Sequence, residues 1–257
     1  MSNIHVVQTG FPSLDRDLGG GFRIGDLMVL GGDSGSGTSS LALAIALHAS
    51  SAGCLFLTSE MSSERVAERA IAIESRVQLS DIRASTTGEI EAANIVAAAT
   101  RVRYRTPIVQ VLQGGGVEAV ASAVAEQAGI ALVVVDGLES LLTSPESIDD
   151  QLCYAVLALK RIAVNSRVAL LLVSHLPGLD DERANRRPRL SDFGARGAIG
   201  IHSDVVLGLY REEIYEADLS LKGAAELLFL KRRDGPLNYV DLYFHEQCMR
   251  FEDVLET

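Results

Sequence analysis

Short apolar runs recur along the chain, and the segments between them carry apolar residues at the spacing of a helix. The runs occupy residues 27–32, 54–60, 131–137, 168–175 and 203–210. The helical segments occupy residues 38–51, 62–76, 89–103, 117–128 and 149–165. Uninterrupted apolar strands that alternate with helices are typical of a parallel sheet covered on both faces. The pattern therefore predicts an α/β fold with a mostly parallel, twisted sheet flanked by helices.

The pattern changes near the C-terminal end, where two strand-like segments follow each other closely. They cover residues 225–235 and 238–246 and meet at Asp234-Gly235-Pro236. This tripeptide is a strong turn signal. We therefore expect a C-terminal antiparallel hairpin beside the parallel strands.

Composition and length fit one domain. The chain has 257 residues, of which 47% are hydrophobic, which is enough for a single large core. No Pro/Ser-rich spacer or internal repeat marks a boundary, so residues 1–257 are interpreted as one domain. The first residues do not resemble a signal peptide, and no segment approaches the ~18 consecutive apolar residues of a membrane span. We expect a soluble, cytoplasmic protein with no membrane partner.

Charge and cysteine content restrict the classes of partner. The net charge of −11 argues against broad binding to polyanions, so any contact with DNA is expected to be local. Cys54, Cys153 and Cys248 are widely spaced and form no C-x-x-C pair. This spacing indicates neither a disulfide framework nor a zinc site.

A glycine-rich loop between the first apolar run and the first long helix is the clearest chemical signal. It reads "GGDSGSGTSS" at residues 31–40 and matches the phosphate-binding pattern G-x-x-x-x-G-K-[ST], except that Thr38 replaces the lysine. Backbone amides and a helix N-terminus attract phosphate in such loops. The predicted nucleotide-binding residues are Gly32, Asp33, Ser34, Gly35, Ser36, Gly37, Thr38, Ser39 and Ser40. The alternative is a glycine-rich turn that holds no ligand.

A series of longer segments carries a family resemblance. In order they are "TGFPSLDRDLGGGFRIGDLMVLGG" (9–32), "LFLTSEMSSERVAERAIA" (55–72), "LVVVDGLESL" (132–141), "LLLVSHL" (170–176), "RRPRLSDF" (186–193), "SDVVLGLYREEIY" (203–215) and "LKGAAELLFLKRRDGPLNYVDLYF" (221–244). Together they resemble the RecA-like motor domain of the DnaB family of replicative helicases over nearly the whole chain. The resemblance implies a RecA-like P-loop NTPase core that uses ATP and Mg²⁺. The N-terminal helical domain and linker of that family have no counterpart, so an isolated motor module is expected.

The resemblance also implies roles for individual residues. Ser39 and Asp136 match the groups that hold Mg²⁺, and Glu60 matches the carboxylate that activates the attacking water. His175 occupies the position of a glutamine that senses the γ-phosphate. A solvated role for Glu60 and a structural role for His175 stay open.

Lys231 and Arg233 match a family K-x-R motif that reaches into the ATP site of the neighbouring subunit. Because they are two residues apart on a strand, both are expected on one face. The resemblance therefore implies a homo-oligomer, a ring hexamer in this family. The alternative is that the two charges only protect a sheet edge.

The replacement of the loop lysine by Thr38 is expected to lower the affinity for nucleotide and the rate of its hydrolysis. A hydrogen bond to a charged group contributes about 1.5–3 kcal/mol, so losing the lysine costs roughly 10- to 100-fold in affinity. The lysine also stabilises charge on the transferred phosphoryl group. We expect nucleotide binding to persist while hydrolysis is impaired.

The predicted DNA-contacting loop also departs from the family. The family reads "SDLRESG" where this chain reads "SDFGARG" at 191–197. Arg196 and Gly197, with Arg187 from the arginine-rich segment 181–189, are the predicted contacts to single-stranded DNA. The alternative for the arginine-rich segment is a basic loop that is only solvated.

Three functions are compatible with these residues. The first is a DnaB-like motor that binds ATP, Mg²⁺ and single-stranded DNA in replication. The second is a catalytically weakened paralogue, a nucleotide-responsive scaffold or regulator that assembles with an intact helicase or other replication proteins. The third is a KaiC- or RadA-like ATPase, which shares the opening "TGF..LD..LGGG", although the "KRRDGP" hairpin favours the DnaB branch.

Overall fold

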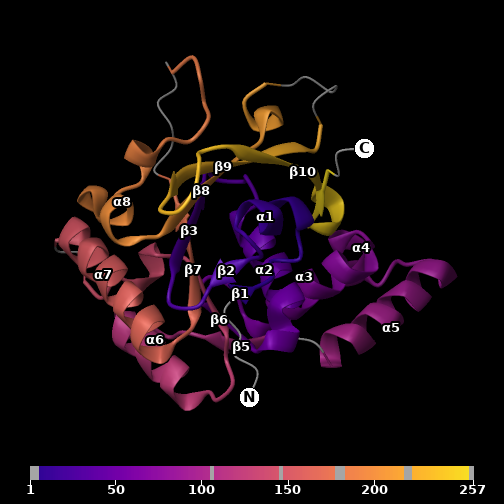
Figure 1. Cartoon of the computed structure of the whole chain (residues 1–257). Coiled ribbons are helices and arrows are strands. Elements are labelled where there is room, and N and C mark those ends of the chain that lie inside the picture. Colours follow the sequence, from indigo (N-terminus) through magenta and orange to yellow (C-terminus); the bar gives the residue numbers. More distant parts are fainter. Residues whose placement is uncertain (1–5, 105–106, 145–146, 177–182, 217–221, 255–257) are drawn as a thin grey trace.

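The computed structural model describes residues 6–104, 107–144, 147–176, 183–216 and 222–254. Within these residues a nine-stranded sheet has the order β11-β10-β9-β8-β3-β7-β6-β4-β5 (Figure 1). Its strands are β3 (Leu27–Gly32), β4 (Cys54–Thr58), β5 (Ile108–Val111), β6 (Leu132–Asp136), β7 (Ala169–His175), β8 (Val205–Tyr210), β9 (Ala224–Arg232), β10 (Tyr239–His245) and β11 (Arg250–Asp253). Strands from β8 to β5 in this order pair in parallel, which confirms the predicted mostly parallel α/β sheet.

Helices cover both faces of the sheet. They are α1 (Pro12–Asp17), α2 (Thr38–Ala49), α3 (Ser63–Ser75), α4 (Leu79–Ala84), α5 (Glu89–Tyr104), α6 (Gly116–Glu126), α7 (Ile148–Ser166) and α8 (Ala198–His202). Side chains alternate along each strand, so Met28 and Leu30 of β3 join the core with α1, α2 and α3. Leu27 and Val29 join the opposite core with α6 and α7. This two-faced burial explains why the strands read as uninterrupted apolar runs.

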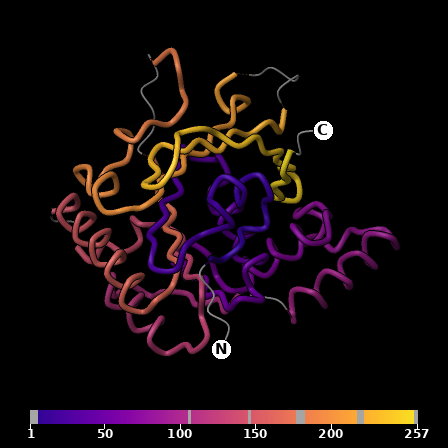
Figure 2. The backbone as a smooth tube through the Cα atoms, in the orientation of Figure 1, coloured from indigo at the N-terminus to yellow at the C-terminus, as the bar shows by residue number. Residues whose placement is uncertain are grey.

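The C-terminal hairpin is present as predicted. β9 pairs antiparallel with β10 and also with β8, which joins the hairpin to the parallel strands. β11 continues the sheet beyond β10 and was not predicted. It contacts α2, and Figure 2 shows the yellow C-terminal strands passing over the indigo segment that holds this helix.

Several short elements have no counterpart in the sequence prediction. They are α1, α4, α8, β5, β11 and a two-stranded ribbon of β1 (Val6–Val7) with β2 (Phe22–Arg23). Each is too short to establish a hydrophobic period, so tertiary contacts rather than local pattern determine it. Within the described residues, no helix combines the length and apolar character needed to cross a bilayer.

Candidate functional site

The parallel register brings the predicted site residues to one edge of the sheet. Gly32 of β3 pairs with His175 of β7, and Thr58 of β4 pairs with Asp136 of β6. Glu60 follows two residues after Thr58, and its backbone N–H donates to the Thr58 hydroxyl at 3.2 Å. Carboxyl ends of parallel strands are where such sheets bind ligands.

The glycine loop runs from the end of β3 to the start of α2. Gly37 is the N-cap residue of α2 and has a φ of 99°, a conformation that glycine adopts without strain. The amide of Ser36 donates to the Asp33 carbonyl at 3.0 Å, and the amide of Ser34 donates to Asp33 Oδ1 at 2.8 Å. Among the described residues, no side chain caps α2. The first amides of the helix are therefore available to an anion.

A pocket of about 320 Å³ opens over this loop. Its lining joins the loop and α2 to α3, β7, β10 and the segment after β8. The lining residues are Gly35, Gly37, Thr38, Ser39, Ser40, Arg69, His175, Arg211, Phe244, Glu246 and Met249. The Ser40 hydroxyl donates to Met249 Sδ at 3.8 Å. The Ser39 hydroxyl instead lies near Asp136, at the end of β6.

Asp136 is fully buried at the end of β6, and within the described residues neither carboxylate oxygen has a partner that meets hydrogen-bond geometry. Burial raises the pKa of Asp136 to about 6, and the charge of Glu60 adds to this shift. The Ser39 hydroxyl, His175 and Arg69 oppose it. An unpartnered carboxylate beside a hydroxyl at a phosphate-binding loop fits Mg²⁺, which takes oxygen ligands from one or two protein groups and from phosphates.

Glu60 and His175 face each other at the mouth of the site. His175 Nε2 lies 3.4 Å from Glu60 Oε1, and both side chains are partly exposed. Gly137, with a φ of 106°, leaves room for Glu60: a Cβ there would lie 2.9 Å from Glu60 Oε1. The structure thus brings together the residues predicted to activate water and to sense the γ-phosphate.

Two arginines that sequence reasoning missed line the same pocket. Arg69 of α3 is half-buried, and its Nε is buried without a hydrogen bond within the described residues. Burial lowers the pKa of Arg69, whereas Asp136 and Glu60 raise it. The available sequence signal is its spacing: Arg69 lies on the helix face of Val66, which is buried.

Arg211, directly after β8, is the second arginine. Its side chain is 4% exposed and forms an ion pair with Glu213 at 2.5 Å. Nη1 donates to the carbonyl of Gly35 in the glycine loop at 3.0 Å, and the guanidinium lies 4.3 Å from the centre of the Phe244 ring. Arg211 therefore supports the loop from outside and forms one wall of the pocket.

Lys231 and Arg233 lie near the end of the strands that is opposite to the glycine loop. Val205, at the start of β8, pairs with Arg232, whereas Gly32 pairs with Leu209. Leu209 lies four residues after Val205 on β8. The level of Arg232 and the level of Gly32 are therefore roughly 13 Å apart along the strand direction.

A register shift interrupts the pairing of β8 and β9 at this point. Lys231 Nζ donates to the Ser203 carbonyl at 2.5 Å, and Arg233 Nη1 lies 3.3 Å from Asp204 Oδ1. Neither cation is among the residues that line the pocket over its own glycine loop.

The predicted DNA-contacting residues are bound to acidic side chains of the same chain. Arg196 pairs with Asp149 at 3.5 Å and also with Asp150. It has a φ of 47°, and Gly197 after it has a φ of 80°. Arg187 forms a bidentate pair with Glu226, with Nε at 2.6 Å from Oε2. The described part of the arginine-rich segment is thus fixed by contacts, while residues 181 and 182 lie outside the described residues.

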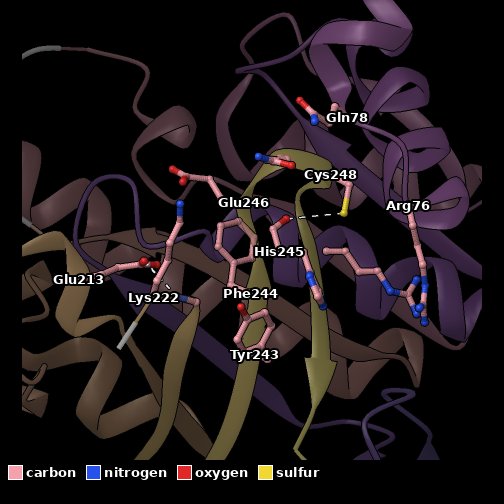
Figure 3. A pocket seen from close by; sticks show the side chains of 12 residues that line it. Arg76, Gln78, Glu213, Lys222, Tyr243, Phe244, His245, Glu246 and Cys248 are labelled. Carbon is pink, nitrogen blue, oxygen red and sulfur yellow. Dashed lines mark hydrogen bonds between the residues drawn. The ribbon is translucent and has the colours of Figure 1, made fainter. Parts of the chain in front are cut away.

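A neighbouring pocket of about 330 Å³ shares Phe244 and Glu246 with the first (Figure 3). Its lining includes Arg76, Arg250 and His245, and all three contact Glu252, at 2.7, 2.8 and 3.0 Å. Lys222 also lines this pocket, but no glycine-rich loop or start of a long helix is among its lining residues.

Curated proteins similar to this chain include replicative helicases. The protein of Leifsonia xyli subsp. xyli named replicative DNA helicase DnaB is 29% identical over 96% of this chain and 56% of its own length. The DnaB helicase of Haemophilus influenzae is 28% identical over 99% of this chain and 57% of its own length. The chain thus spans a little over half the length of these curated relatives.

Solved structures show the same fold. A DnaB-like replicative helicase, described with its interactions with primase, superposes with a TM-score of 0.92 at 23% identity, over 99% of this chain and 63% of that one. A second solved structure, described as an ATPase domain, gives a TM-score of 0.91 at 23% identity, over 98% of this chain and 93% of that one.

The sequence matches the family model described as "DnaB-like helicase C terminal domain" over residues 6–253. This match agrees with the RecA-like arrangement of the sheet and with the position of the glycine loop, and it selects the DnaB branch over the KaiC- or RadA-like alternative. The chain belongs to the family of DnaB-like helicase C-terminal domains.

Proposed function

We propose that this chain binds ATP with Mg²⁺ as the motor module of a DnaB-type helicase in DNA replication. The observation that carries the proposal is that the glycine loop, Asp136 and Glu60 lie at the same carboxyl edge of the sheet. Ser39 of the loop and Glu60 both act on the pKa of Asp136. Membership of the family supports ATP as the nucleotide and the cytoplasm as the compartment.

Asp136 and Ser39 would hold Mg²⁺, which when bound neutralises the charge of the phosphates. Glu60, two residues beyond β4, accepts the proton of the attacking water in this proposal. His175 donates a hydrogen bond toward the terminal phosphate or orients Glu60, from which it lies 3.4 Å. The amides at the start of α2 bind the phosphates.

In this proposal, Arg69 provides the positive charge that the lysine of the glycine loop would otherwise bring to the phosphates. Thr38 is 3% exposed and uncharged, so it cannot compensate for phosphate charge. The Arg69 side chain lines the phosphate pocket and already lies in the field of Asp136 and Glu60. Its planar guanidinium binds phosphate oxygens in a bidentate manner. Hydrolysis stays impaired in this proposal, because Arg69 lies on α3 and not at the glycine-loop position where Thr38 replaces the lysine.

Lys231 and Arg233 act in a neighbouring subunit. They lie at the edge opposite their own glycine loop, so a contribution to ATP requires a second copy of the chain. A ring hexamer, as the family resemblance implies, would repeat this contact around a closed circle.

Arg196, Gly197 and Arg187 contact single-stranded DNA in this proposal. Arg196 would exchange Asp149 and Asp150 for backbone phosphate, and exposed ion pairs of this kind cost little to break. The Arg187 pair with Glu226 is less exposed and holds its guanidinium more firmly.

The second candidate function is a nucleotide-responsive scaffold that assembles with an intact helicase. The buried Thr38 in the glycine loop favours it, since binding can persist without turnover. Phosphate release with and without single-stranded DNA, measured for the unaltered chain and for Thr38→Lys, separates the candidates. DNA-stimulated release by the unaltered chain supports the motor, and release only after Thr38→Lys supports the scaffold. Thr38→Met controls for side-chain length without charge.

A further inference from the structure

Two tyrosines lie between the glycine loop and the arginine segment, which we define as residues 183–189. Tyr215 Oη donates to Asp33 Oδ2 of the glycine loop at 3.0 Å. The Tyr215 ring is stacked on Tyr210, with centroids 5.7 Å apart and planes 13° apart. The phosphate-binding loop is thus joined by a hydrogen bond to a stacked ring pair.

Both rings of the pair contact the arginine segment. The Arg186 guanidinium lies 5.4 Å from the centre of the Tyr215 ring, and that of Arg187 lies 4.7 Å from the centre of Tyr210. Cations in this position are attracted by the ring faces.

The arginine segment continues this contact toward the predicted DNA loop at 191–197. Arg183 donates to the Arg187 carbonyl at 2.5 Å and to Asp192 Oδ2 at 2.7 Å. A continuous series of contacts therefore runs from Asp33 to Asp192.

Asp33 makes this series sensitive to the nucleotide. Its carboxylate belongs to the loop that holds the triphosphate in the proposed function, and like charges repel. Its Oδ1 already accepts from the Ser34 amide, so a shift of Asp33 acts on both the loop backbone and Tyr215. Burial and Asp33 raise the pKa of Tyr215, so the hydroxyl remains protonated and can only donate to the carboxylate.

We propose that the hydrogen bond between Tyr215 and Asp33 couples ATP at the glycine loop to the arrangement of the arginine segment. This inference rests on the proposed ATP binding. ATP moves Asp33, Tyr215 follows through its hydroxyl, and Arg186 and Arg187 follow their ring partners. If ATP changes the affinity of the arginine segment for a ligand by some factor, then that ligand changes the affinity for ATP by the same factor, because the coupling of two binding sites is reciprocal.

The test measures the rate of trypsin cleavage after Arg183 and Arg186, with and without saturating ATP and Mg²⁺. Thermal shift in the same samples reports ATP binding. We expect ATP to change the cleavage rate by about fivefold or more, a typical lower value for coupled sites. Tyr215→Phe keeps the stacked ring, removes the hydroxyl and should reduce the change to less than about twofold, because the link to Asp33 is then lost. Tyr210→Phe is the matched control, because it removes a hydroxyl from the same ring pair and should keep the full change.

Each outcome has a defined meaning. If ATP binds but leaves cleavage of the unaltered chain unchanged, or if Tyr215→Phe responds as fully as Tyr210→Phe, the coupling is overturned and the proposed function stands. If ATP does not bind the unaltered chain, the proposed function falls and the coupling falls with it. Tyr215→Leu, which removes both stacking and hydroxyl, should also lose the response.

Discussion

Glu60 Oε1 and His175 Nε2 lie 3.4 Å apart, although β6 lies in the sheet between β4, which Glu60 follows, and β7, which ends at His175. The contact places the proposed general base beside His175, which lines the pocket over the glycine loop. In the proposed function, a base in this position would act on a water molecule near the terminal phosphate.

Glu60→Gln should reduce phosphate release at least about 100-fold, because general-base catalysis contributes roughly 10²–10⁴-fold. ATP affinity should change less than about threefold, since the carboxylate takes part in proton transfer and not in phosphate binding. Single-turnover phosphate release and equilibrium titration measure the two effects. Glu64→Gln, at an exposed position at the start of α3, is the control. Equal rates for both variants would remove Glu60 from the mechanism.

Asp136→Asn should stabilise the ligand-free protein at neutral pH. The pKa of folded Asp136 is raised to about 6 from an ordinary value of 3.8, so the folded chain binds this proton more tightly than the unfolded chain. Ionisation of Asp136 therefore costs stability above pH 6, and the cost disappears as pH falls toward 4. The shift corresponds to about 3 kcal/mol as an upper value, and we expect a gain of about 1–3 kcal/mol near neutral pH.

Urea unfolding of both proteins at about pH 7.5 and about pH 4.5, on either side of the raised pKa, measures this gain. The difference in the free energy of unfolding should be large at the higher pH and small at the lower one. The same substitution should remove the Mg²⁺-dependent part of ATP binding. A variant less stable than the original at the higher pH would show that Asp136 has partners that offset its burial.

The sequence predicted the elements and residues that depend on local pattern. The parallel strands other than β5, the hairpin at Asp234-Gly235-Pro236 and the position of Asp136 at the end of β6 all follow from apolar runs and turn signals. The family match confirms the resemblance that was carried by longer segments.

Contacts between distant segments were not predictable in this way. Arg69 enters the pocket because α3 packs beside α2, and Arg211 reaches Gly35 across 176 residues of chain. The arginine segment appears simply as a basic segment in the sequence, but in the structure Arg183 pairs with Asp192 and Arg187 pairs with Glu226. Such pairings depend on tertiary geometry, which periodicity does not encode.

Subunit mixing tests the proposed role of Arg233. Arg233→Ala and Glu60→Gln should each be nearly inactive in phosphate release, the first through loss of a cation supplied in trans, for which losses of about 10³-fold or more are known. Mixed oligomers should recover part of the activity, because some interfaces then combine an intact Arg233 with an intact Glu60. Arg232→Ala, whose side chain donates to the Asp17 carbonyl of its own chain, is the control. Absence of recovery in verified mixed oligomers would contradict action in trans.

The central claim is that helix amides and Arg69 bind a triphosphate without a lysine in the glycine loop. Calorimetric titration with ATP and Mg²⁺ tests it directly, comparing the unaltered chain, Arg69→Ala and the exposed Arg65→Ala one turn earlier on α3. We predict saturable binding by the unaltered chain and by Arg65→Ala, and a loss of roughly 10- to 100-fold for Arg69→Ala. No binding by the unaltered chain, or equal affinity for all three proteins, would contradict the claim.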